Sequence, residues 1–176
     1  MDKEKLEQQL AQLPLYQYAF IRTEELVFTE RVRKICEMEC PMYGKTWACP
    51  PAVGSVEDCK KRCLAYPEAL VITTITEVSD IANLQETLDT RSPHEAVTRE
   101  AAAFVKEQAA EVMVLSTEAC AICEQCAYPD GPCRHADKMY PCVESHGILA
   151  TEIAEKYGID FFDGNIVTWF SIIFYR

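Results

Sequence analysis

The sequence lacks any long hydrophobic run. No stretch of about 18 or more apolar residues could span a membrane, and residues 1–8 contain no apolar segment resembling the core of a signal peptide. We therefore expect no membrane partner and a cytoplasmic location. Thiols stay reduced in the cytoplasm, where cysteine clusters are more often metal sites than disulfides.

Basic charge is also scarce. The chain has 17 Lys and Arg against 28 Asp and Glu, a formal net charge of −11, and no Lys/Arg block with interleaved aromatic residues. Phosphate backbones would be repelled on average, so we expect no nucleic-acid partner. An acidic surface keeps a protein soluble and would also suit a basic patch on a redox partner. Charge alone therefore selects no partner.

Several catalytic motifs are missing as well. The chain has no glycine-rich phosphate loop, no Ser/His/Asp arrangement and no HExxH pattern. Nucleotide and flavin binding therefore have no support, and the sequence leaves open whether the protein is an enzyme.

The length and composition indicate one folded domain over residues 1–176. At 176 residues, 49% hydrophobic and 26% charged, the chain can bury a core without covalent or metal staples. Its ten cysteines are therefore not needed merely to make it fold.

Alternating strand and helix patterns predict an α/β (or α+β) fold, with a central sheet of about four strands flanked by helices and two cysteine-rich metal-binding loops. Expected strands cover residues 15–21, 69–76 and 112–116, and the apolar run 166–175 is expected as a central strand. Expected helices cover 30–38, the stretch after a Ser55/Asp58 capping box, 92–110 with Ser92 as its cap, and 144–157. We expect His94 and His146 to be exposed near helix starts.

Two groups of cysteines carry the chemistry, and both lie in Pro- and Gly-containing loops entered from regular elements. The first group contains Cys36, Cys40 and Cys49, with Cys59 and Cys63 on the helix that follows. The second group contains Cys120, Cys123, Cys126 and Cys133, with Cys142 further on.

The spacing Cys120-x2-Cys123-x2-Cys126 is the most specific signal in the chain. Bacterial ferredoxins use such a run to hold an iron–sulfur cluster, with a further cysteine completing the set. Zinc sites more often combine two separated Cys-x2-Cys pairs, whereas here the pairs overlap at Cys123. The pattern favours two 4Fe–4S clusters, and zinc is the alternative.

The fourth ligand of the first group is not settled by spacing. Cys59 at the first turn of a helix would gain a lowered thiol pKa, which favours ligation, so we predict that it completes the set. If Cys36, Cys40 and Cys49 act alone, one iron stays open to a substrate. Cys63 and Cys142 are expected to be plain core residues.

The cysteine motifs resemble those of a prokaryotic family described as predicted metal-binding proteins, a cysteine-rich domain of unknown function. The resemblance rests on Cys36-x3-Cys40-Pro41, the segment from Tyr43 to Pro51, the segment from Cys123 to Pro129, the segment from Pro132 to His135, and on Glu144 and Gly147. It implies a cysteine-ligated metal centre and names no reaction. In this pattern Cys142 stands where a serine is expected.

Three functions follow from these residues. The first is electron transfer to a redox partner protein through two 4Fe–4S clusters, with Arg134 or His135 supplying positive charge beside the second cluster. The second is an iron–sulfur enzyme with an open iron, where Arg134 and Glu144 would handle a small-molecule substrate. The third is a zinc-binding structural module. The oligomeric state does not follow from the sequence.

Overall fold

The computed structural model describes all residues from 1 to 176. Its α-helices are α1 (Lys3–Leu10), α2 (Glu30–Glu39), α3 (Val56–Leu64), α4 (Leu84–Asp89), α5 (Arg91–Lys106) and α6 (Ala150–Tyr157), and its two 3-10 helices are η1 (Thr23–Glu25) and η2 (Glu144–His146). Its strands are β1 (Gln17–Arg22), β2 (Glu68–Glu77), β3 (Val112–Leu115) and β4 (Ile166–Tyr175). No helix has the length and apolar character needed to cross a membrane.

The four strands form one sheet in the order β1-β2-β4-β3, and every neighbouring pair is antiparallel. The prediction of a four-strand sheet flanked by helices is confirmed, and the antiparallel pairing makes the fold α+β. The last strand, β4, is a central strand as expected, paired with β2 on one side and β3 on the other.

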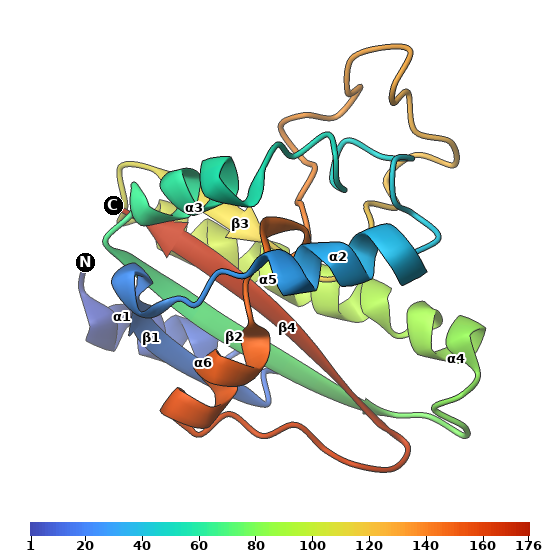
Figure 1. The fold of residues 1–176 in the computed structure, drawn as a ribbon. Coiled ribbons are helices and arrows are strands. Elements are labelled where there is room, and N and C mark those ends of the chain that lie inside the picture. The colour runs from blue at the N-terminus through green and yellow to red at the C-terminus, as the bar shows by residue number, and fades with distance from the viewer.

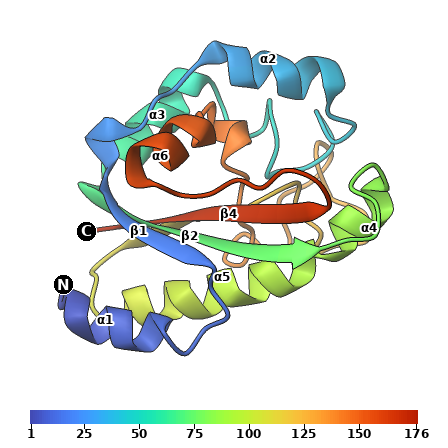
Figure 2. The same ribbon diagram turned by 90° about the horizontal axis from the view of Figure 1, so that it is seen from below.

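Helices cover both faces of the sheet, so the domain has three layers (Figure 2). Along β2, Ala69 and Val71 point into a core shared with α3 and α6, whereas Leu70 and Ile72 point into a second core shared with α1 and α5. Successive residues of a strand face opposite sides, so one apolar run supplies both cores. This arrangement leaves the cysteine loops outside the sheet.

The two cysteine loops lie at the same end of the domain, beyond the C-terminal end of α2 (Figure 1). The second loop leaves β3 at Ser116 and returns beside its own start, because Ser116 and Cys142 form a parallel bridge. The Ser116 amide donates to the Pro141 carbonyl at 2.8 Å, and the Val143 amide donates to the Ser116 carbonyl at 3.0 Å. Cys142 is thereby placed at the base of the loop.

Local sequence signals predicted the start of α3 correctly and the start of α5 incorrectly. The capping box at α3 is confirmed, since the Ser55 side chain accepts from the Asp58 amide and the Asp58 side chain accepts from the Ser55 amide. The predicted start of α5, with Ser92 as its cap, was wrong. The helix begins at Arg91, directly after Thr90, which ends α4. Ser92 is therefore inside the helix and caps nothing.

The expected helix over 144–157 is interrupted. The chain makes the 3-10 turn η2, passes through Gly147 in the left-handed conformation (φ +73°), and starts α6 only at Ala150. A β-carbon at Gly147 would lie 3.0 Å from a methyl group of Val56 and 3.1 Å from the Thr29 carbonyl oxygen. Glycine is required here by both conformation and space.

The prediction of exposed histidines was wrong. His94 is only 1% exposed, and its ring nitrogens form hydrogen bonds of 2.8 Å with Oγ1 of Thr74 and 2.7 Å with Oγ of Ser171. His146 is also 1% exposed. On α5, His94 lies three and four residues before Val97 and Thr98, which puts it on the face that packs against the sheet.

Candidate metal centre

Four cysteines from three separate segments line one cavity of about 490 Å³. Cys36 is on α2, Cys40 caps its C-terminal end, Cys49 belongs to the loop that follows, and Cys142 comes from the base of the second loop. The local turn is held by the Cys40 amide, which donates to the Cys36 carbonyl at 3.3 Å, and by the Cys49 amide, which donates to the Thr46 carbonyl at 3.3 Å. We call this space the first cavity.

Burial raises the pKa of three thiols in the first cavity. It raises the pKa of Cys36 to about 11, with a smaller contribution from neighbouring Cys40, and it raises the pKa of Cys49 although Thr46 opposes the shift. The pKa of Cys142 is raised well above its ordinary value, again mainly by burial. A metal binds thiolate, so metal uptake here must release protons.

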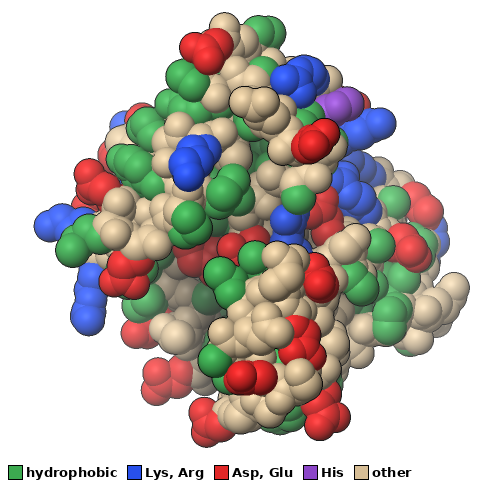
Figure 3. All heavy atoms as spheres, turned by 90° about the vertical axis from the view of Figure 1, so that its right-hand side faces the viewer, with side chains coloured by type: hydrophobic (Ala, Val, Ile, Leu, Met, Phe, Trp, Pro, Cys, Tyr) green, Lys and Arg blue, Asp and Glu red, His purple; other side chains and the backbone are tan.

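The first cavity also contains three carboxylates and an aromatic side chain. It is lined by Glu39, Glu118, Glu144 and Tyr43, together with aliphatic residues of α2 and the start of α6. Glu144 keeps accessible surface because it faces the cavity, yet protein surrounds it, and desolvation raises the pKa of its carboxyl. Figure 3 views the molecule from the right-hand side of Figure 1. It shows a recess on that face, with acidic side chains at its centre and basic side chains beside it.

The remaining four loop cysteines line a second cavity. Cys120, Cys123, Cys126 and Cys133 surround a space of about 20 Å³, which we call the second cavity. Arg134 and His135 line it too, as the sequence suggested. Arg134 is not paired with a carboxylate, since its Nη1 instead donates to the Gln125 carbonyl at 3.1 Å.

The two cavities are neighbours, joined by residues 47–49. Cys49 lines the first cavity, whereas Trp47 and Ala48 line the second. The Trp47 indole donates to the Gly131 carbonyl at 2.9 Å and meets the Tyr128 ring edge-to-face with centroids 4.9 Å apart. These contacts tie the first cysteine loop to the second.

The two cysteines of α3 lie elsewhere. Cys59 is fully buried and lines neither cavity; its Sγ lies 3.1 Å from Nη2 of Arg62 and 3.6 Å from Nη2 of Arg33. The expected lowering of the Cys59 pKa was wrong, because burial outweighs both arginines and raises it. Cys63 is fully buried in the core beside α6, as expected.

Sequence reasoning therefore placed seven of the eight thiols around these cavities and missed Cys142. Its signal was weak, since it stands nine residues beyond Cys133 and outside the compact spacing. Only the bridge between Ser116 and Cys142 brings its thiol to the first group.

The donor sets suit thiolate ligation, but the two cavities differ in size. No three His, Cys, Asp or Glu side chains are placed as they stand to bond one metal ion. Sulfurs around one zinc would lie within about 4 Å of each other, given Zn–S bonds of about 2.3 Å. In a 4Fe–4S cluster each thiolate holds a different iron, so wider spacing is tolerated. The first cavity has room for such a group, whereas the second has room for about one ion-sized body.

An α+β domain with two thiol-lined cavities belongs to the cysteine-rich, metal-binding class of proteins. A family model described as "Predicted metal-binding protein (DUF2284)" matches residues 19–175, nearly the whole chain, and includes both cysteine groups. The protein belongs to this family. No curated protein and no solved structure matches the chain.

Proposed function

We propose that the protein is an iron–sulfur protein that holds two 4Fe–4S clusters and transfers electrons to a partner protein. One observation carries the proposal: each of two adjacent cavities is lined by four cysteines, which accounts for eight of the ten in the chain. The two cysteines left over, Cys59 and Cys63, are fully buried on α3. Thiols packed as ordinary core residues would have no reason to divide into two sets of four.

In this proposal the first cluster is held by Cys36, Cys40, Cys49 and Cys142, and Cys59 is not a ligand. The second is held by Cys120, Cys123, Cys126 and Cys133. A bound 4Fe–4S cluster accepts and releases one electron at a time. Because the second cavity is small, its loop must widen to admit a cluster.

The chain's own residues have defined tasks in this function. Tyr43 lines the first cavity and Trp47 lines the second, where each would limit the access of water to a bound cluster. Arg134 and His135 place positive charge or N–H donors beside the second set of thiolates, which favours the more negative, reduced state. The contacts of Trp47 with the second loop keep the two centres adjacent, and short separation favours electron exchange between them.

The test is the composition of protein purified without oxygen. We expect a brown protein with broad absorption near about 400 nm and about eight iron and eight acid-labile sulfide per chain. Colourless protein without iron and sulfide, whose thiols are all readily alkylated while folded, would overturn the proposal.

Ligand assignment is tested by matched alanine variants of two buried cysteines. Cys142→Ala should lose about half of the iron, whereas Cys59→Ala should keep all of it. The reverse result would restore Cys59 as the fourth ligand. Circular dichroism on both variants checks that the fold is retained.

A second candidate is an iron–sulfur enzyme with one open iron. It is favoured by the size of the first cavity, by its aliphatic wall and by its three carboxylates, Glu39, Glu118 and Glu144. In that case Cys36, Cys40 and Cys49 suffice, and a small molecule would bind opposite them. Full iron retention in both Cys142→Ala and Cys59→Ala would favour this enzyme over the closed electron carrier.

The zinc module is a third candidate, supported by the small second cavity. About one zinc per chain, with no sulfide, would put it first.

A further inference from the structure

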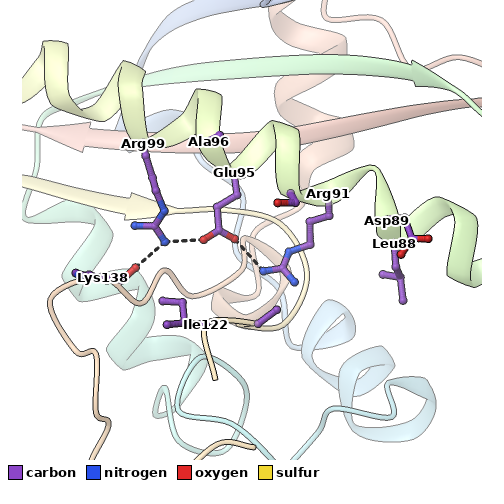
Figure 4. A pocket seen from close by; sticks show the side chains of 10 residues that line it. Leu88, Asp89, Arg91, Glu95, Ala96, Arg99, Ile122 and Lys138 are labelled. Carbon is purple, nitrogen blue, oxygen red and sulfur yellow. Dashed lines mark hydrogen bonds and ion pairs between the residues drawn. The ribbon is translucent and has the colours of Figure 1, made fainter. Parts of the chain in front are cut away.

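A third cavity, outside both sets of cysteines, lies between α5 and the start of the second loop. Its volume is about 750 Å³, within the range of small-molecule sites. Arg91, Glu95 and Arg99 reach into it from one face of α5, and Ile122 and Lys138 border it on the loop side (Figure 4). We call this space the α5 cavity.

The charge of the α5 cavity is opposite to that of the chain. Three cationic side chains, Arg91, Arg99 and Lys138, line it together with only two carboxylates, Asp89 and Glu95, in a protein with a net charge of −11. Such a local excess of positive charge within an acidic protein favours an anionic occupant.

The arginines of this cavity are held in place before any ligand arrives. Nη2 of Arg91 lies 2.8 Å and Nη2 of Arg99 lies 2.5 Å from the two carboxylate oxygens of Glu95. Nη2 of Arg99 also donates to the Lys138 carbonyl at 2.8 Å, and its guanidinium lies 4.4 Å from the Tyr140 ring centroid. Fixed cations lose little conformational entropy when they bind a ligand.

One donor in the cavity wall has no partner. Nε of Arg91 is shielded from solvent and makes no hydrogen bond, although the side chain as a whole is 13% exposed. A buried donor without an acceptor is unfavourable. A ligand oxygen cannot reach this shielded atom as the wall stands, but Nη1 of Arg91 also has no partner in the protein and is not shielded, so a carboxylate or phosphate oxygen can bind there.

The rest of the wall selects the kind of anion. Leu88, Ala96 and Ile122 provide apolar surface beside the cations. An inorganic ion would leave this surface uncovered, whereas a compact carbon skeleton would cover it.

We propose that the α5 cavity binds a small organic anion, a carboxylate or phosphate ester, with Arg91 as its principal contact and Arg99 and Lys138 beside it. The occupant would lie against the second loop, because Ile122 borders both this cavity and the second cavity. The site thus lies where an anionic substrate or effector would meet the second set of thiols. The proposal stands on these contacts and does not depend on which metal the thiols hold.

The test is calorimetric titration of the anaerobically purified protein with succinate, inorganic phosphate and uncharged succinamide. Succinate or phosphate should bind with a dissociation constant below about 1 mM at about 0.1 M salt, and succinamide should not bind. Binding of succinate alone identifies a carboxylate site, and binding of phosphate alone identifies a phosphate site. Absence of heat with both anions at about 10 mM would overturn the proposal.

Two variants locate the site. Arg91→Ala should weaken binding at least about tenfold, whereas Arg31→Ala, which removes an exposed arginine of α2, should leave it unchanged. Glu95→Gln should strengthen binding, because the competing negative charge is gone while the amide oxygen can still accept a hydrogen bond from an arginine. A purely structural role for Glu95 predicts no gain. Unchanged affinity in a folded Arg91→Ala protein would refute the assignment.

The same titration on chelator-treated, folded protein separates this proposal from the proposed function. Anion binding that persists without metal supports the site whatever the iron analysis finds. Iron found without any anion binding refutes only the site.

Discussion

The buried His94 makes a quantitative prediction about stability at acidic pH. Burial on α5 lowers the pKa of His94 to about 4, from an ordinary value of 6.5; Glu95 opposes this shift and Arg91 adds slightly to it. Between about pH 4 and pH 6.5, His94 therefore binds a proton in the unfolded chain but not in the folded chain. Stability contributed by this residue is present above about pH 6.5 and is lost as the pH falls toward 4.

The size of the effect follows from proton linkage. With pKa values of 6.5 unfolded and about 4 folded, the free energy of unfolding falls by about 2 kcal/mol between about pH 7.5 and pH 5.0. This is a large fraction of the about 5–15 kcal/mol that stabilises a typical domain. His146, whose pKa burial lowers to about 3, adds a loss of the same sign.

Urea unfolding at both pH values measures the effect as a difference between variants. In His94→Gln the neutral amide keeps some polar contacts with Thr74 and Ser171 but cannot titrate. The decrease in the free energy of unfolding between the two pH values should therefore be about 2 kcal/mol smaller in this variant than in the wild type. Thr98→Val is the matched control. It removes a 3.0 Å hydrogen bond from Thr98 to Ser171 and a longer, 3.4 Å contact with Nε2 of His94, but it leaves the imidazole in place. It should therefore lower stability by about 1 kcal/mol at both pH values.

The reasoning fails if wild type and His94→Gln lose the same stability on acidification. It also fails if the free energy of unfolding of Thr98→Val is the same at both pH values. This variant keeps the imidazole, so the imidazole would then not be the source of the pH dependence.

Three further predictions concern single side chains. Cys63→Ser should cost about 1–3 kcal/mol in urea unfolding, because it places a hydroxyl in the core, and should leave the metal content unchanged; loss of metal would show that Cys63 is a ligand. Gly147→Ala should cost more than about 1 kcal/mol, because the backbone is left-handed and Val56 is 3.0 Å from the added carbon; a neutral result would contradict the left-handed conformation. Trp47→Phe removes the hydrogen bond to Gly131 and should cost about 1 kcal/mol; faster hydrogen exchange in the second loop, and not in the sheet, would confirm that Trp47 ties the loops together.

What the sequence determined by itself is local in origin. The capping box of α3 follows from Ser55 and Asp58 three residues apart, and the central position of β4 follows from an apolar run long enough to be covered on both faces. The convergence of Cys120, Cys123, Cys126 and Cys133 on one cavity also follows from close spacing in one loop.

Tertiary structure decided the features that depend on segments far apart in the chain. His94 is buried because Thr74 and Ser171 on two strands meet its ring, which no helix signal near Ser92 could reveal. Cys142 reaches the first cavity, and Cys59 does not, because the loop after β3 returns to Ser116 while α3 turns Cys59 into the space between two arginines. Spacing along the chain fixes which thiols can be neighbours within one loop, but strand pairing fixes which loops meet.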